Sequence, residues 1–121
     1  LLLYFHNFYY KEGLGMEKEI YEMHASICQI MANAKRLEII SILGNRELIV
    51  GDIAEKMEIR MSNLSQHLSI MKAKGILKSR RDGVNIHYRI ANPKVVQACK
   101  LMREVMMEQM REKGRLSMSG M

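Results

Sequence analysis

The sequence has few of the residues that mark several protein classes. Its 121 residues include two cysteines, one proline and no tryptophan. Two cysteines, Cys28 and Cys99, are too few for a disulfide-stapled secreted scaffold, so we expect a reducing, cytoplasmic environment. Since no apolar run approaches the ~20 residues of a membrane span, and the apolar opening has no basic leader or cleavage site, we expect no membrane association and no secretory signal.

Acidic residues are scarce in one stretch of the chain. Between Arg60 and Arg89 there are seven basic residues and a single acid, Asp82, a net charge of +6. The whole chain also carries +6, so the remaining residues balance. A charge that served only solubility would be spread over the surface, whereas a concentrated cationic segment is typical of a surface that binds a polyanion. Nucleic acid is therefore the first partner that we expect.

Apolar periodicity predicts a mostly α-helical chain with one β-hairpin. We expect helices over 17–32, 34–43, 51–57, 61–74 and 93–111, and strands over 76–80 and 84–90. Asp82-Gly83 between the two strands is a strong hairpin signal. Only Glu58, Ile59 and Arg60 separate the third and fourth helices, which is the tight connection of a helix-turn-helix. This order predicts a winged helix-turn-helix with an added helix at each end.

The length allows one domain, and we place it at residues 16–112 as a winged-helix DNA-binding and dimerisation domain. Residues 1–15 end in a Gly13-Leu14-Gly15 break and are expected to be an N-terminal extension, either upstream sequence or a vector-derived addition. Residues 113–121 are small and polar, and we expect a flexible tail there. Inward-facing residues are expected to be Leu37, Ile40 and Leu43 in the second helix, and Met61, Leu64, Leu68 and Met71 in the fourth.

The opposite face of the fourth helix is polar and contains no acid. Asn and Gln side chains can bond adenine bidentately, and Ser is short enough to reach base edges or phosphates. The hairpin adds cations that could reach the DNA backbone. The residues predicted to contact double-stranded DNA are Ser62, Asn63, Ser65, Gln66, His67, Ser69 and Lys72 on the helix, and Lys78, Arg80, Arg81 and Arg89 on the hairpin.

From about Ala32 to Arg103 the chain resembles the ArsR/SmtB family of repressors. The motifs that carry the resemblance are 33–40, 47–54, Ser62-Asn63-Leu64-Ser65-Gln66-His67-Leu68, the hairpin segment 75–83, and 87–90. The resemblance implies a dimeric repressor that leaves its operator when a metal, metalloid or oxidant binds. Metal-sensing members often have cysteines where this chain has Ile49 and Gly51, and others have ligands where it has Asn92 and Lys94. We therefore expect no metal and no cofactor, and the inducer stays unidentified.

Two helices carry apolar stripes that a domain of this size cannot cover. The residues predicted to form a homodimer interface are Ile20, Met23 and Ile27 in the first helix, and Val95, Cys99, Met102 and Met106 in the last. Burial against a two-fold mate is the economical solution, and it would set two recognition helices ~34 Å apart on a pseudo-palindrome. We interpret the methionines as pliable packing in preference to a soft-metal site.

Three roles remain open for the cysteines. His24 lies one turn before Cys28, and Arg103 one turn after Cys99, and a positive neighbour at that spacing can stabilise a thiolate. Cys28 and Cys99 could be structural, they could form an oxidant-responsive thiol switch, or they could bind a soft metal together with His24. We favour the structural role, because a free cysteine often behaves as a small hydrophobe.

The predicted function is a sequence-specific transcriptional repressor acting as a homodimer. The alternative is a winged-helix module for protein–protein or RNA interaction, which would bind DNA without operator specificity. We expect no enzymatic activity, since the chain has no phosphate-cradling glycine loop and no nucleophile–base pair, and its histidines lie on different elements.

Overall fold

The computed structural model describes residues 2–114, with side chains from residue 15 onward. The chain divides after Asn33 into two units, and each is described by itself. The predicted tail at 113–121 lies almost wholly outside the described residues. In the part of the chain that is described, no helix combines the length and the apolarity needed to cross a membrane.

The first unit is one long helix, α1 (Leu2–Met31). The sequence predicted a helix from residue 17, but α1 begins fifteen residues earlier and runs through Gly13 and Gly15 without a break. A glycine inside a helix costs only about 1 kcal/mol relative to alanine, so two glycines weaken a long helix without ending it. The helix ends where the N–H of Asn33 turns back to the carbonyl of Met31 at 2.8 Å.

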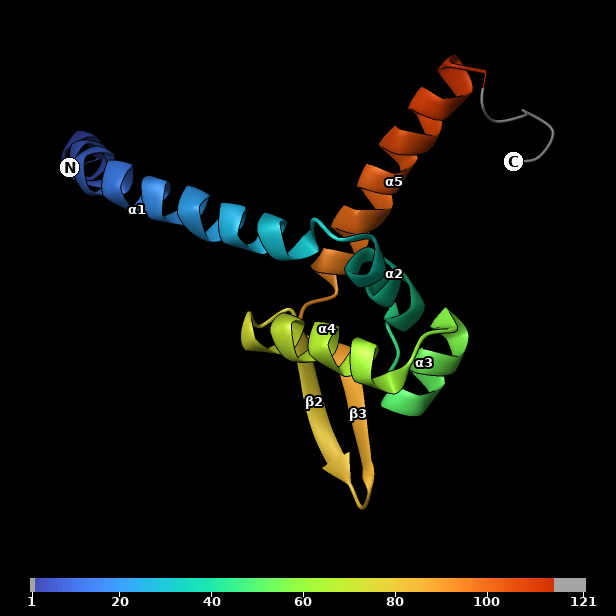
Figure 1. The fold of residues 1–121 in the computed structure, drawn as a ribbon. Helices are drawn as coiled ribbons and strands as arrows, with labels where there is room; N and C mark the ends of the chain where they lie inside the picture. The colour runs from blue at the N-terminus through green and yellow to red at the C-terminus, as the bar shows by residue number, and fades with distance from the viewer. Residues whose placement is uncertain (1, 115–121) are drawn as a thin grey trace. The chain divides into compact units, whose positions relative to one another are not determined.

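The second unit is the winged helix-turn-helix that the sequence predicts (Figure 1). Its elements are α2 (Ala34–Leu43), β1 (Leu48–Ile49), α3 (Val50–Met57), α4 (Met61–Ala73), β2 (Leu77–Asp82), β3 (Asn85–Ile90) and α5 (Lys94–Glu112). Within this unit the hairpin and α5 leave the helical body at opposite ends (Figure 1). The start of α5 is fixed by the side chain of Asn92, whose Oδ1 accepts the N–H of Lys94 at 3.0 Å.

The core lies where α2, α3, α4 and the sheet meet. Its fully buried side chains are Ile39, Ile40, Leu43, Ile53, Leu64, Leu68, Met71 and Leu77. The prediction that Leu37 and Met61 lie in the core is wrong, because Leu37 is 45% exposed and Met61 is 55% exposed. At about 100° per residue Leu37 points more than 100° away from the centre of the buried stripe of α2. Met61 is the first residue of α4 and extends past the elements that cover the rest of that helix.

The connection between α3 and α4 depends on one residue in a left-handed conformation. Glu58 has φ 56° and ψ 42°, a region in which side chains other than glycine are strained. This conformation lets the N–H of Ile59 return to the carbonyl of Ala54 at 3.2 Å, and the chain can then start α4 at once. The tight connection is what allows α4 to protrude from the body.

Three antiparallel strands form the sheet, in the order β1-β3-β2. The two-residue strand β1 was not predicted, because so short a segment has no detectable alternation. The hairpin turn lies at Gly83 and Val84, slightly later than the predicted 81–83, since Gly83 (φ 61°) supplies the positive φ that a two-residue turn needs. Tyr88 and Ile90 are buried and Ile86 is partly buried, so this side of β3 faces the core.

Candidate nucleic-acid interface

The two faces of α4 have opposite chemistry. Leu64, Leu68 and Met71 are fully buried against the body. The other side of the helix is exposed and consists of Ser62, Asn63, Ser65, Gln66, Ser69 and Lys72, all predicted from the sequence to contact DNA. No residue of α4 is acidic. The helix therefore presents hydrogen-bonding groups to solvent with nothing that repels a phosphate.

His67 is placed differently from its neighbours. It is partly buried, and its Nδ1 accepts a hydrogen bond from Nε of Arg36 on α2 at 3.1 Å. Burial lowers the pKa of His67 from its ordinary value of 6.5, and the charges of Arg36 and Lys35 lower it further. The ring is consequently neutral at pH 7 and ties α4 to α2. Any contact that His67 makes with DNA must use the rest of the ring.

The outer face of the hairpin gathers basic side chains in facing positions. Lys78 on β2 is opposite Arg89 on β3, and Arg80 is opposite His87. Lys78 and Arg89 are like charges directly across the strand pair, which is destabilising, so the fold does not gain from this pair. A surface that keeps such charges together has a use for them outside the fold.

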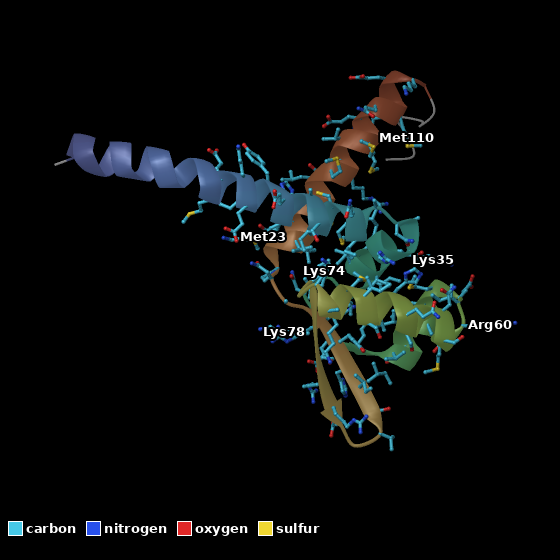
Figure 2. All side chains as sticks on the ribbon, turned by 60° about the vertical axis from the view of Figure 1, so that its left-hand side comes forward. Met23, Lys35, Arg60, Lys74, Lys78 and Met110 are labelled. Carbon is cyan, nitrogen blue, oxygen red and sulfur yellow. The ribbon has the colours of Figure 1, made fainter. Side chains whose placement is uncertain are left out.

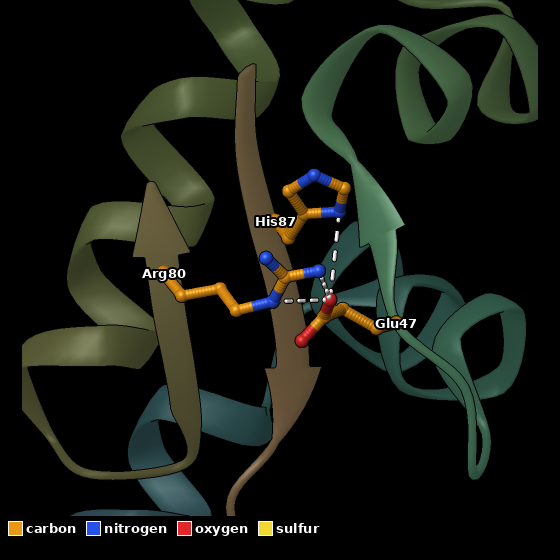
Figure 3. A network of polar contacts seen from close by, with 3 residues as sticks. All are labelled: Glu47, Arg80 and His87. Atoms are coloured by element: carbon orange, nitrogen blue, oxygen red, sulfur yellow. Dashed lines mark hydrogen bonds and ion pairs between the residues drawn. The ribbon is translucent and has the colours of Figure 1, made fainter. Parts of the chain in front are cut away.

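Glu47 lies in the middle of these cations, just before β1. Its Oε1 accepts a hydrogen bond from Nε of Arg80 at 2.7 Å and forms an ion pair with Nη2 of Arg80 at 2.6 Å. The same oxygen lies 3.5 Å from Nδ1 of His87 (Figure 3). The hydrogen bond from Arg80 lowers the pKa of Glu47 against an opposing effect of desolvation, and the same bond raises the pKa of Arg80. Sequence reasoning missed this partner of Arg80, because the strand pairing that brings Glu47 close was not predicted.

An open hollow of about 450 Å³ joins the end of α4 to this sheet face. Its lining includes Lys72 from α4, Lys78 and Arg80 from β2, Arg89 from β3, and Glu47. Arg60 at the start of α4 and Lys78 on β2 also reach outward (Figure 2). Lys72 at the end of α4 and the cations of the hairpin thus line one hollow.

The residues predicted for a dimer interface lie on both units. Ile20 and Met23 on α1 and Met102 and Met106 on α5 are exposed. Ile27 on α1 and Val95 and Cys99 on α5 are partly buried. Each stripe is therefore only partly covered, and apolar side chains of both remain exposed.

The candidate sensing residues do not form one cluster on a single element. His24 and Cys28 are both exposed on α1, whereas Cys99 is partly buried on α5 in the other unit. Burial raises the pKa of the Cys99 thiol. This shift opposes the thiolate that the neighbouring Arg103 was expected to stabilise, because a reactive cysteine needs a lowered pKa.

The sequence matches a family of known regulators. The model of the family described as "Bacterial regulatory protein, arsR family" matches residues 33–79. The chain is 36% identical over 85 residues to the transcriptional repressor PagR of Bacillus anthracis, covering 69% of this chain and 85% of PagR. It is 38% identical over 76 residues to the nodulation protein NolR of Rhizobium meliloti, covering 63% of this chain and 62% of NolR, so the match spans less than two thirds of NolR.

Solved structures have the same fold. A protein of Mycobacterium bovis, described as a homodimeric winged helix-turn-helix DNA-binding domain, superposes with a TM-score of 0.71 at 27% identity, covering 79% of this chain and 89% of that one. The PagR structure gives a TM-score of 0.63 at 36% identity, with coverage of 70% and 98%. The predicted winged helix-turn-helix is thereby confirmed. Such regulators are not enzymes, which confirms that expectation too, and the chain belongs to the arsR family of bacterial regulatory proteins.

Proposed function

We propose that this protein is a sequence-specific transcriptional repressor that binds a pseudo-palindromic operator as a homodimer. The observation that carries the proposal is the acid-free exposed face of α4, whose Lys72 shares a hollow with Lys78 and Arg89 of the hairpin. Ser62, Asn63, Ser65, Gln66 and Ser69 would face base edges or nearby phosphates. Lys72, Lys78, Arg81 and Arg89 would hold the backbone on either side.

The apolar stripes support a homodimer as the binding species. Leu101, Met102, Val105, Met106 and Met110 are exposed along α5, and Met16, Ile20, Tyr21 and Met23 are exposed along α1. An isologous interface buries such stripes twice, once from each copy. The homodimeric description of the Mycobacterium bovis protein favours the same assembly here. Two recognition helices related by a two-fold axis would bind half-sites about one DNA turn apart, ~34 Å.

The test is selection of bound duplexes from a random library, followed by fluorescence anisotropy on the selected sequence with excess random competitor. We expect an inverted repeat and tight binding that survives the competitor. Binding that is equally strong on selected and random duplexes would contradict the repressor and favour the alternative, an interaction module for proteins or RNA.

The same assay tests whether an oxidant or a soft metal releases the protein from DNA. A thiol switch predicts that diamide releases the DNA and that a Cys99→Ser variant no longer responds. A soft-metal site predicts release by Cu(I) or Zn²⁺ that requires His24, Cys28 and Cys99. Binding that persists under oxidation and with either metal would leave Cys99 as a packing residue, the role that its raised pKa favours, and would leave the exposed Cys28 without a sensing role.

A further inference from the structure

Glu47 is out of place on a surface that would face DNA. Of the charged residues that line the hollow between α4 and the sheet, four are basic and Glu47 alone is acidic. A carboxylate at this position repels the phosphates that the four cations attract. Its presence therefore needs an explanation that the proposed DNA contacts do not give.

The geometry shows which cation Glu47 affects. In the sheet order β1-β3-β2, Glu47 precedes one outer strand and Arg80 lies on the other, so the side chain of Arg80 crosses the central strand to reach it (Figure 3). Two guanidinium nitrogens contact the same oxygen, Oε1, at 2.7 and 2.6 Å.

Exposure shows why the pair can also open. The side chain of Arg80 is 56% exposed and that of Glu47 is 27% exposed, so the ion pair is at the surface and not locked in the core. Exposed pairs are weak, and a DNA phosphate can compete for the same guanidinium. Glu47 has the advantage of being held in place by its own strand, whereas a phosphate must arrive from solution.

We propose that Glu47 is a specificity-setting residue that competes with DNA phosphate for Arg80. This inference rests on the proposed DNA-binding function and deepens it. On arbitrary DNA, Arg80 stays with Glu47 and releases no counterion, so non-specific affinity is lower than the number of basic residues implies. On an operator, the base contacts of α4 hold the backbone against the hairpin long enough for Arg80 to transfer to a phosphate. Glu47 thus widens the difference between operator and random sequence.

The experiment is a salt titration of binding to a random-sequence duplex by the full chain. Glu47→Gln removes the competing charge, and we expect the slope of log K against log salt to steepen by about one unit, with affinity gained on the order of tenfold at 0.1 M salt. Glu55→Gln on α3 is the matched control, because it removes the same charge from an exposed residue that does not pair with Arg80. We expect its slope to equal that of wild type.

Two further variants make the result decisive. In an Arg80→Ala background the gain from Glu47→Gln should vanish, since no guanidinium remains to be released. Glu47→Ala should reproduce the gain, and thermal unfolding of each variant verifies that it is folded. A Glu47→Gln slope equal to that of Glu55→Gln, or weaker binding by Glu47→Gln, would overturn the inference while leaving DNA binding intact. Wild-type protein that binds no duplex at all would overturn the proposed function and the inference together.

Discussion

Helices α4 and α5 are both amphipathic, yet they bury their apolar sides to very different degrees. In α4, Leu64, Leu68 and Met71 are fully buried by other elements of the same unit. In α5 only Val96, near the start, is buried. Val95, Cys99 and Met107 are partly buried, and five further apolar residues of α5 keep 39–63% of their surface exposed: Leu101, Met102, Val105, Met106 and Met110. The second unit completes its core around α4 and leaves the apolar stripe of α5 exposed.

The strongest test of this comparison places charges on the exposed stripe of α5. Met102→Glu with Met106→Glu should leave the protein monomeric at micromolar concentration, because a two-fold interface would have to bury four unpaired carboxylates at several kcal/mol each. Sedimentation velocity measures the change. The matched control is Gln97→Glu with Lys100→Gln, which alters the net charge of α5 by the same amount on the opposite side of the helix. Wild-type protein that is already monomeric would contradict the dimer.

Substitutions on the buried side of α4 should lower the stability of the fold. Leu68→Ala should lower the free energy of unfolding by about 2–5 kcal/mol, since it leaves a cavity in a fully buried position. Urea unfolding at one fixed protein concentration measures the loss, because dimerisation makes stability depend on concentration. Ile70→Ala on the exposed side of the same helix is the control and should cost much less. Similar losses in both variants would mean that α4 is not packed as described.

Substitutions on the DNA-facing surface should weaken DNA binding and leave the stability of the fold unchanged. If Gln66 bonds a base, Gln66→Ala should weaken operator binding by about 1–3 kcal/mol and leave binding to random duplexes unchanged. Arg81→Ala should instead weaken all sequences alike and flatten the salt slope by about one unit, because a phosphate contact carries no sequence information. Anisotropy on both duplexes across a salt series separates the two effects. Equal effects of both variants on operator and random DNA would remove α4 from its role in recognition.

The sequence could predict features that depend on local periodicity, but not contacts between residues far apart in the chain. The periodicity of Leu64, Leu68 and Met71 located α4 and both of its faces, because spacing at 3.6 residues records burial directly. Leu37 and Met61 each lie three residues before a buried residue, and this spacing placed them in the core. Leu37 nevertheless points away from the centre of the buried stripe of α2, and Met61 is the first residue of α4. The contacts of Glu47 with Arg80 and of Arg36 with His67 join residues more than thirty positions apart. Such pairs follow from tertiary packing and leave no local signal in the sequence.

The turn before α4 offers a smaller, stabilising test. Glu58 adopts a left-handed conformation that a glycine adopts without strain, so Glu58→Gly should raise the free energy of unfolding by up to about 1 kcal/mol. Urea unfolding measures the gain. The control is Glu55→Gly within α3, which should be destabilising by about 1 kcal/mol because a helical position gains nothing from glycine. A loss of stability in Glu58→Gly would show that the side chain of Glu58 stabilises the fold by more than the strain of its backbone conformation costs.

The smallest expected effect concerns the join between α4 and α2. The pKa of His67 is lower in the folded protein than its ordinary value of 6.5, so between these two values the unfolded chain binds the proton and the folded chain does not. The contribution of His67 is therefore fully present above about pH 6.5 and is lost as the pH falls toward the lowered pKa. His67→Gln keeps an acceptor for Arg36 but does not titrate, so the free energy of unfolding should fall less between pH 7.5 and 5.5 than in wild type.

The pH range in which His67 acts differs from that of Glu47, the other residue discussed whose pKa is lowered. The pKa of Glu47 is lowered from 4.5, so its stabilising contribution is lost only as the pH falls below that value. Urea unfolding at pH 7.5, 6.5 and 5.5 is thus sensitive to His67 and insensitive to Glu47. All other residues are common to both proteins, so the difference between wild type and His67→Gln isolates the effect of His67. Parallel pH profiles would mean that His67 is as accessible to protons in the folded protein as in the unfolded chain, and that α4 is joined to α2 by its apolar contacts alone.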